Sequence, residues 1–222
     1  MGSKYRELAD YDHALRLIVV GDYNTGKTTF INTYIRQDNT NTVYDPTIGI
    51  DFASRNIELG GGEIVKLACW DTSGQENFRS IVRSYYKDIC GAFLVYDVTS
   101  RRSFANLLTW MNDIRRNASC KGHEHPILLL GTKIDVGRRQ VPKEEVLRFA
   151  DDNNLLYAET NALTGENLDL VVPQFAARIL RGPGVERCKG IKHRMRAMEV
   201  EKDGISLQER SPPGEKTCCV VS

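Results

Sequence analysis

The clearest chemical pattern in the sequence is a glycine-rich stretch that ends in a lysine and a threonine. It runs Gly21-Asp22-Tyr23-Asn24-Thr25-Gly26-Lys27-Thr28 and fits the phosphate-loop spacing of Gly, four residues, then Gly-Lys-Ser/Thr. Its glycines let main-chain N–H groups approach phosphate oxygens, and the helix that follows adds its positive end. Lys27 is predicted to neutralise the β- and γ-phosphates, and the Thr28 hydroxyl to ligate Mg²⁺. The predicted phosphate-binding residues here are Asp22, Tyr23, Asn24, Thr25, Gly26, Lys27, Thr28 and Thr29.

A second polar motif, Asp71-Thr72-Ser73-Gly74-Gln75, directly follows an apolar run. Asp71 then stands at a strand end, where a carboxylate can hold Mg²⁺ through a water. Gly74 is predicted to bring an N–H to the γ-phosphate, and Gln75 to orient an attacking water. Taken alone, the motif is equally compatible with an ordinary turn. The phosphate loop upstream favours the functional interpretation.

A third segment, Tyr44-Asp45-Pro46-Thr47-Ile48-Gly49, ends the polar stretch Gln37–Thr42. Thr47 is predicted to offer its hydroxyl to Mg²⁺ and its N–H to the γ-phosphate. Because these contacts exist only while the third phosphate does, hydrolysis is predicted to release two loops. The predicted catalytic residues are Gln75, Lys27 and Thr47, and the predicted metal ligands are Thr28, Thr47 and Asp71.

Two later segments are suited to a purine base. Leu130-Gly131-Thr132-Lys133-Ile134-Asp135 follows an apolar run, and the Asp135 carboxylate can accept from both guanine N1–H and the 2-amino group. Adenine has no such donor pair, so the sequence favours guanine. Lys133 is predicted to lay its stem on the ring, and Ala162 to present its N–H to guanine O6. The predicted guanine-binding residues are Thr132, Lys133, Asp135, Asn161, Ala162 and Leu163.

Alternating β-branched runs and helical periodicities predict an α/β fold in which strands carry these motifs at their ends. The strands are expected at Leu15–Val20, Ile50–Leu59, Glu63–Trp70, Ala92–Tyr96, Ile127–Leu130 and Leu155–Ala158. The helices are expected at Lys27–Ile35, Ser103–Arg116, Lys143–Asp151 and Leu168–Leu180. Gly60-Gly61-Gly62 predicts a hairpin within an otherwise parallel sheet.

Composition limits the other classes of function. The 222 residues suffice for one domain and a tail, and a formal net charge of +1 argues against nucleic-acid binding. No apolar run approaches the roughly 20 residues that span a bilayer. The start lacks a secretory signal, and Arg6 stands where a myristoylation motif needs Ser or Thr. A cytosolic protein is therefore expected, with Cys69, Cys90, Cys120 and Cys188 as reduced thiols.

With these motifs in place, the chain resembles a Ras-superfamily GTPase of the Rab branch over about Leu15 to Arg181. The segments that resemble Rab proteins are Ile48–Phe52, Lys66–Thr72, Phe78–Ile81, Tyr85–Lys87 and Val95–Thr99. The resemblance implies a Ras-like P-loop GTPase fold with a six-stranded, mostly parallel sheet, one antiparallel edge strand and five helices. It also implies bound GTP or GDP with Mg²⁺, and GTP hydrolysis that is slow unaided because no arginine finger is evident in cis.

The resemblance further implies partner proteins: effectors that read the two switch loops, exchange factors, activating proteins, a prenylation escort and a GDP-dissociation inhibitor. The implied effector-binding residues are Ile48, Phe52, Trp70 and Tyr85. The implied role is vesicular membrane traffic. The expected domains are an N-terminal extension (1–13), the GTPase domain (14–181) and a flexible hypervariable tail (182–222).

The chain departs from the family pattern mainly around the base. Thr132 replaces an Asn whose amide touches the base and braces the phosphate loop, and Asn161-Ala162-Leu163 replaces Ser-Ala-Lys. An aromatic residue normally covers the base near Asn39 or Thr40, and Tyr34 and Tyr44 are the candidates to replace it. Losing one or two hydrogen bonds costs on the order of 1–3 kcal/mol, so binding is expected to survive with faster spontaneous nucleotide exchange.

Tyr23 and Asn24 also replace smaller residues over the γ-phosphate. The bulk of Tyr23 either obstructs an activating protein's arginine or swings to solvent, and both readings stay open from the sequence.

The chain ends in Cys218-Cys219-Val220-Val221-Ser222. Cys219 begins a prenylation box whose terminal Ser is typical of farnesyl, whereas a Cys-Cys pair resembles the dual geranylgeranylation of Rab proteins, which we favour. Two lipids anchor stably where one is marginal. The protein is therefore expected on the cytoplasmic face of an intracellular membrane, with a cytosolic pool.

Two other classes of function compete with a GTP-hydrolysing switch. One is a membrane-tethered interaction module with weak or fast-exchanging nucleotide and little hydrolysis, suggested by Thr132, Leu163 and Tyr23. The other is a phosphotransferase or ATPase, which would share the phosphate loop. This class does not account for Thr132–Asp135 or for the prenylatable end, so it is less favoured.

Overall fold

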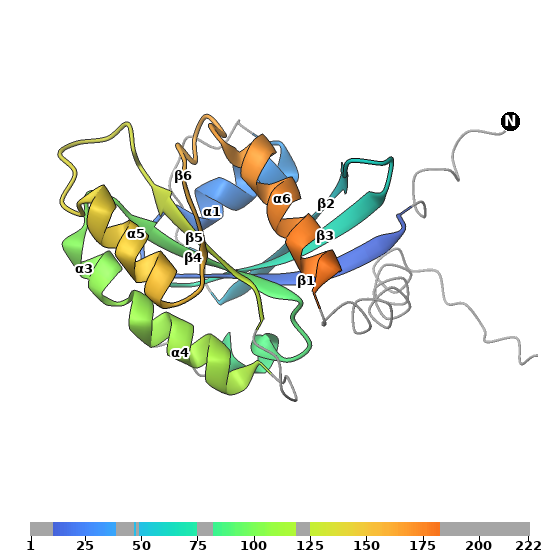
Figure 1. The fold of residues 1–222 in the computed structure, drawn as a ribbon, viewed down its shortest axis with the longest axis horizontal. Helices are drawn as coiled ribbons and strands as arrows, with labels where there is room; N and C mark the ends of the chain where they lie inside the picture. Colours follow the sequence, from blue (N-terminus) through green and yellow to red (C-terminus); the bar gives the residue numbers. More distant parts are fainter. Residues whose placement is uncertain (1–10, 39–46, 48, 75–81, 119–124, 183–222) are drawn as a thin grey trace, which may run out of the picture.

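The computed structural model of the chain describes residues 11–38, 47, 49–74, 82–118 and 125–182. Strands and helices alternate along it, as the hydrophobic pattern predicts (Figure 1). In chain order the elements are β1 (His13–Val20), α1 (Lys27–Phe30), the π-helix η1 (Ile31–Arg36), β2 (Ile50–Glu58), β3 (Ile64–Thr72), the 3-10 helix η3 (Ser84–Tyr86), β4 (Gly91–Asp97), α3 (Arg101–Ala105), α4 (Leu107–Asn117), β5 (Ile127–Thr132), α5 (Lys143–Asp152), β6 (Leu156–Glu159) and α6 (Leu168–Arg181).

The strands form one sheet in the order β2-β3-β1-β4-β5-β6. Every neighbouring pair is parallel except β2 and β3, which form the predicted hairpin and leave β2 as an antiparallel edge strand. The prediction of a six-stranded, mostly parallel sheet with one antiparallel edge strand is therefore confirmed. Two helical predictions are refined: 27–35 forms α1 followed by η1, and 103–116 forms α3 and α4, which meet at Asn106.

Aromatic side chains on β4 show how helices cover both faces of the sheet. Phe93 contacts Phe30 of α1 and Phe175 of α6, with ring centroids 4.9 and 5.2 Å apart. Tyr96 lies three residues along the strand, so it points to the opposite face, where its ring meets Phe104 of α3. Figure 1 shows the same layers, with α1 and α6 on one side and α3, α4 and α5 on the other.

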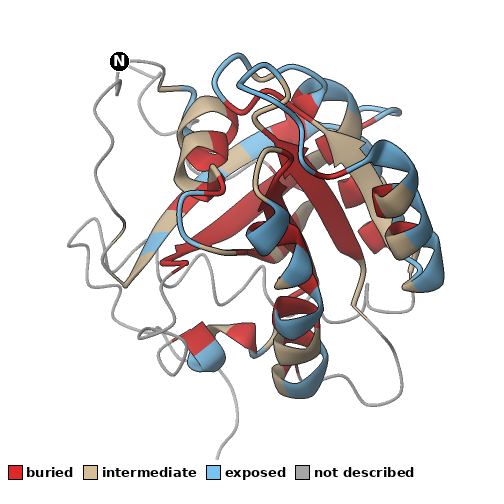
Figure 2. Cartoon of the chain, turned by 90° about the vertical axis from the view of Figure 1, so that its left-hand side faces the viewer, coloured by how far each residue is buried: buried red, intermediate tan, exposed pale blue. Residues whose placement is uncertain are grey.

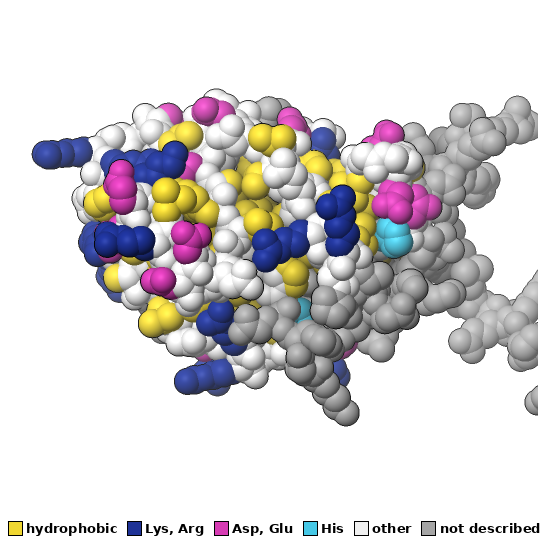
Figure 3. Space-filling model, viewed as in Figure 1, with side chains coloured by type: hydrophobic (Ala, Val, Ile, Leu, Met, Phe, Trp, Pro, Cys, Tyr) yellow, Lys and Arg dark blue, Asp and Glu magenta, His cyan; other side chains and the backbone are white. Residues whose placement is uncertain are grey.

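The central strands are buried on both faces. All residues of β4 and β5 are buried, and these strands form the red centre of Figure 2. Such runs are typical of parallel strands covered by helices on both sides. On the face drawn in Figure 3, acidic and basic side chains are interspersed. None of the helices in the described ranges combines the length and the apolar content that crossing a bilayer requires.

The parallel strands bring the predicted motifs to one edge of the sheet. β1, β3, β5 and β6 each run directly into one of them, and the carboxyl ends of parallel strands lie at the same edge. Ligands of open α/β sheets bind in this position.

Candidate functional site

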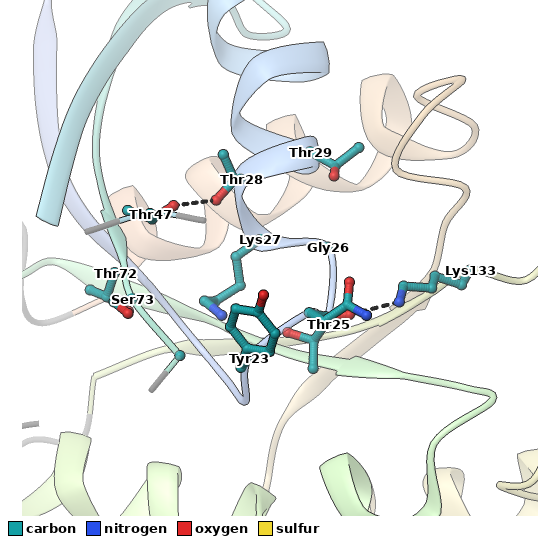
Figure 4. A pocket seen from close by; sticks show the side chains of 12 residues that line it. Tyr23, Thr25, Gly26, Lys27, Thr28, Thr29, Thr47, Thr72, Ser73 and Lys133 are labelled. Carbon is teal, nitrogen blue, oxygen red and sulfur yellow. Dashed lines mark hydrogen bonds between the residues drawn. The ribbon is translucent and has the colours of Figure 1, made fainter. Parts of the chain in front are cut away.

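The phosphate loop closes around a cavity at this edge. Its lining comes from the phosphate loop, from the residues after β3, from Thr47 and from Lys133 (Figure 4). The lining residues are Tyr23, Asn24, Thr25, Gly26, Lys27, Thr28, Thr29, Thr47, Thr72, Ser73, Gly74 and Lys133. Gly26 has φ +87, a left-handed conformation that glycine adopts without strain, and it turns the chain into α1.

Lys27 reaches into the cavity from the first turn of α1 (Figure 4). Its Nζ donates to the main-chain oxygen of Asp22, 2.8 Å away. Burial lowers the pKa of Lys27 to about 8, although Asp71 and Asp22 act to raise it. No carboxylate of the described residues forms an ion pair with this buried ammonium, which suits a site that takes its counter-charge from a phosphate ligand.

Three side chains from distant parts of the chain meet beside Lys27. The Thr28 hydroxyl donates to Asp71 Oδ2 at 2.6 Å and lies 2.7 Å from the Thr47 hydroxyl oxygen. The two threonines and the aspartate are the predicted metal ligands, and the structure brings all of them together.

The residues present fit a hard divalent cation. Asp71 is buried, its Oδ1 has no hydrogen-bond partner among the described residues, and burial raises its pKa despite the hydrogen bond from Thr28. A cation that draws on this orphaned oxygen and the two hydroxyls would stabilise the charged carboxylate. Such all-oxygen donors are those that Mg²⁺ prefers.

Gly74 approaches the phosphate loop more closely than any other residue type allows. A Cβ at Gly74 would lie 2.4 Å from both the Asp22 carbonyl carbon and the Tyr23 nitrogen. Gly74 can therefore line the cavity at this distance from the phosphate loop only because it has no side chain. Gln75, the next residue and the predicted orienter of water, lies outside the described residues, as does Ile48.

Thr132 braces the phosphate loop from the end of β5. Its hydroxyl is fully buried and lies 2.6 Å from the Thr25 main-chain oxygen and 3.0 Å from that of Tyr96. Since a hydroxyl has one hydrogen, the shorter bond to Thr25 dominates. Thr132 therefore makes the contact to the phosphate loop that the family's Asn is expected to make. The contact of that Asn amide to the base has no equivalent in the Thr132 side chain.

The other base-side residues lie around the same edge. Lys133 crosses to the phosphate loop, where its Nζ donates to Asn24 O at 2.7 Å and pairs with Asp97 Oδ2 at 2.9 Å. Asp135, the predicted guanine-selecting residue, is exposed. Asn161 Oδ1 accepts from the N–H groups of Leu163 and Thr164, which shapes the loop after β6. Ala162 is buried, and Leu163 is 64% exposed.

Of the two tyrosines named as candidates to cover the base, Tyr34 is packed into the core instead. Its ring is 4% exposed, stacks on Phe30 with centroids 6.1 Å apart, and lies under the Arg55 guanidinium. Tyr34 falls on the inward face of η1, and this apolar packing holds it in the core. Tyr44, the other candidate, lies outside the described residues.

Two of the three aromatic residues implied to bind effectors, Phe52, Trp70 and Tyr85, are in contact with each other. Phe52 and Trp70 are partners across the antiparallel β2–β3 pair, with ring centroids 4.9 Å apart, and the Arg16 guanidinium lies 4.0 Å from the Trp70 ring. Tyr85, in η3, is half-buried. Cys218 and Cys219 lie outside the described residues.

Sequence reasoning missed the partners of the Asp22 carboxylate. This side chain points toward α4 and accepts from Asn106 Nδ2 at 2.6 Å and Trp110 Nε1 at 2.8 Å. The only signal in the sequence was their four-residue spacing, which places both on one face of a helix.

Comparison with known proteins identifies relatives across most of the chain. Residues 16–181 match the family described as "Ras family". The chain is 42% identical over 178 residues to Ras-related protein Rab-13 of Rattus norvegicus, covering 80% of this chain and 85% of that protein. It is 42% identical over 174 residues to Ras-related protein Rab-4A of Homo sapiens, covering 77% of this chain and 76% of that protein.

Proposed function

The chain belongs to the Ras family and is a small GTPase of the Rab type, and from this premise we propose that it is a Mg²⁺-dependent switch that cycles between GDP and GTP. The observation that carries the proposal is the meeting of Thr28, Thr47 and Asp71 beside Lys27. Thr47 lies near the end of one predicted switch loop and Asp71 lies directly before the other, so a cation and a γ-phosphate bound here would hold both loops.

Each group has a defined task in this proposal. Lys27 and the phosphate-loop N–H groups hold the β- and γ-phosphates, Gly74 offers its N–H to the γ-phosphate, and Gln75 orients the attacking water. Mg²⁺, when held by Thr28, Thr47 and Asp71, supplies charge neutralisation. Hydrolysis is slow unaided, because no arginine finger is evident in the chain.

The guanine side of the site distinguishes this chain from its family pattern. Asp135 selects guanine, the Lys133 stem lies on the ring and Ala162 offers its N–H to O6. Thr132 keeps the brace to Thr25 but offers no amide to the base. We therefore expect spontaneous GDP release that is faster than the family norm.

Tyr23 adds a second peculiarity. Its ring is 47% exposed and stands at the mouth of the phosphate cavity, in front of Lys27 in Figure 4. A ring in this position lies where an activating protein's arginine would enter. We expect Tyr23 to slow stimulated hydrolysis, and Tyr23→Ser to raise the stimulated rate while leaving unaided hydrolysis nearly unchanged.

The cellular part of the proposal is regulation of vesicular membrane traffic from the cytoplasmic face of an intracellular membrane. The GTPase domain (14–181) recruits effectors through Ile48, Phe52, Trp70 and Tyr85. The tail (182–222) carries lipid on Cys218 and Cys219. Exchange factors, activating proteins, a prenylation escort and a GDP-dissociation inhibitor act on the cycle.

The decisive experiment measures which nucleotide stays on the purified protein and how fast it leaves. Chromatography of the denatured protein should show GDP or GTP, and release of fluorescent GDP should be slowed by Thr132→Asn. The outcome that would instead support the membrane-tethered interaction module is a purified protein that retains no guanine nucleotide and does not bind added GDP when Mg²⁺ is present.

A further inference from the structure

The phosphate loop carries a negative charge of its own. Asp22 is its second residue, and a carboxylate free to turn toward a bound nucleotide would repel the phosphates that the loop must hold. Residues 23–29 all line the phosphate cavity, but Asp22 does not. The direction of this side chain therefore matters for nucleotide binding.

Two donors hold the Asp22 carboxylate on the side away from the cavity. Trp110 Nε1 donates to Oδ1 at 2.8 Å, and Asn106 Nδ2 donates to Oδ2 at 2.6 Å. Each carboxylate oxygen thus receives its own hydrogen bond. Bonds to a charged acceptor are roughly twice as strong as neutral ones, so the pair fixes the rotamer of Asp22.

Both donors stand on a rigid support. Trp110 is 1% exposed, on the inner face of α4, and Asn106 is the residue at which α3 ends and α4 begins. The loop is therefore tied to the helical layer that covers one face of the sheet.

The main chain of Asp22 connects this tie to the phosphate-binding groups. Its carbonyl oxygen accepts from Lys27 Nζ at 2.8 Å and from the Thr25 hydroxyl at 2.9 Å. Its carbonyl carbon lies so close to Gly74 that a Cβ there would approach to 2.4 Å. A shift of Asp22 would thus displace both the lysine and the glycine that face the γ-phosphate.

We propose that Asn106 and Trp110 are positioning residues that hold the phosphate loop's own carboxylate against α4, and that they set the rate of nucleotide release by keeping its charge off the phosphates. The proposal rests on the proposed function, because it needs a nucleotide in the cavity. It adds a link between α4 and the phosphate site to the roles given above.

The test measures fluorescent GDP release from the full chain with Mg²⁺. Trp110→Phe keeps a ring in the core and removes the donor, and Asn106→Leu removes the other donor. Each should accelerate release about tenfold, the effect of losing one charge-assisted hydrogen bond. Leu108→Ala, an exposed position on the same helix, is the matched control and should release GDP at the parent rate.

A second pair of variants separates charge from packing. Asp22→Asn keeps the shape of the side chain without its charge, so adding Trp110→Phe to it should change release less than about twofold. If Trp110→Phe accelerates release equally in both backgrounds, Trp110 acts by packing and the proposal is overturned. Parent-like release from both donor variants overturns it as well. A parent protein that binds no GDP would refute the proposed function instead.

Discussion

The hydroxyl of Thr132 offers the sharpest test of how the phosphate loop is held in place. Thr132→Val keeps the shape of the side chain and removes the only group that donates from β5 to the Thr25 main-chain oxygen, 2.6 Å away. The site is fully buried, so no water replaces the lost donor without rearrangement. A buried acceptor left unsatisfied costs about 1–3 kcal/mol of unfolding free energy.

This cost converts into a measurable melting temperature. For a domain of this size, 1 kcal/mol shifts Tm by about 2–4 °C, so Thr132→Val should melt about 2–12 °C below the parent at the same GDP concentration. GDP release should also accelerate, because the loop that grips the phosphates has lost its brace. Circular dichroism and fluorescent GDP measure the two effects.

The matched control is Thr109→Val on the exposed side of α4, which should change the unfolding free energy by less than about 0.5 kcal/mol. Equal Tm values for parent and Thr132→Val would show that the bond to Thr25 contributes nothing to stability. Lower Tm with unchanged GDP release would refute the coupling between this brace and the nucleotide.

Three further outcomes are expected. Asp71→Asn should weaken Mg²⁺ binding about ten- to a hundredfold, so GDP release should no longer differ between Mg²⁺ and a chelator. Gln75→Leu should abolish most GTP hydrolysis while leaving GDP affinity unchanged; hydrolysis at the parent rate would remove Gln75 from the mechanism. Burial acts to raise the pKa of Glu159, but hydrogen bonds from Arg139 and Tyr157 outweigh it and hold the pKa below its ordinary 4.5. Glu159 therefore stabilises the fold above pH 4.5 and loses this contribution below it, so the Tm gap between parent and Glu159→Gln should narrow on acidification and a constant gap would contradict this.

Much of the site was predictable because its signals are local. A phosphate loop needs its glycines, lysine and threonine within eight consecutive residues, and the apolar run before it and the helical periodicity after it place them at a strand end. The sheet was predictable for a similar reason, since buried parallel strands read as continuous apolar runs and Gly60–Gly62 marks the hairpin between β2 and β3.

The direction of a side chain was less predictable for residue types that are equally suited to a binding site and to the hydrophobic core. A tyrosine three residues before a polar loop suits a base or a core equally well, and only the packing of η1 on Phe30 and Arg55 decides for the core. Likewise, the position of Thr132 on β5 shows that its hydroxyl takes over the bracing role expected of an amide.

The sequence by itself determined the residue types on which the proposed chemistry rests, namely a lysine and hydroxyls proposed for phosphate and metal and an aspartate proposed for guanine, and it determined the α/β pattern that supports them. Only the tertiary structure decided which of these groups touch. Thr28 meets Asp71 across 43 positions and Asp22 meets Trp110 across 88, and hydrogen bonds act over about 3 Å. Contacts that short depend on strand register and on how each helix docks, which residue types and spacing along the chain do not specify.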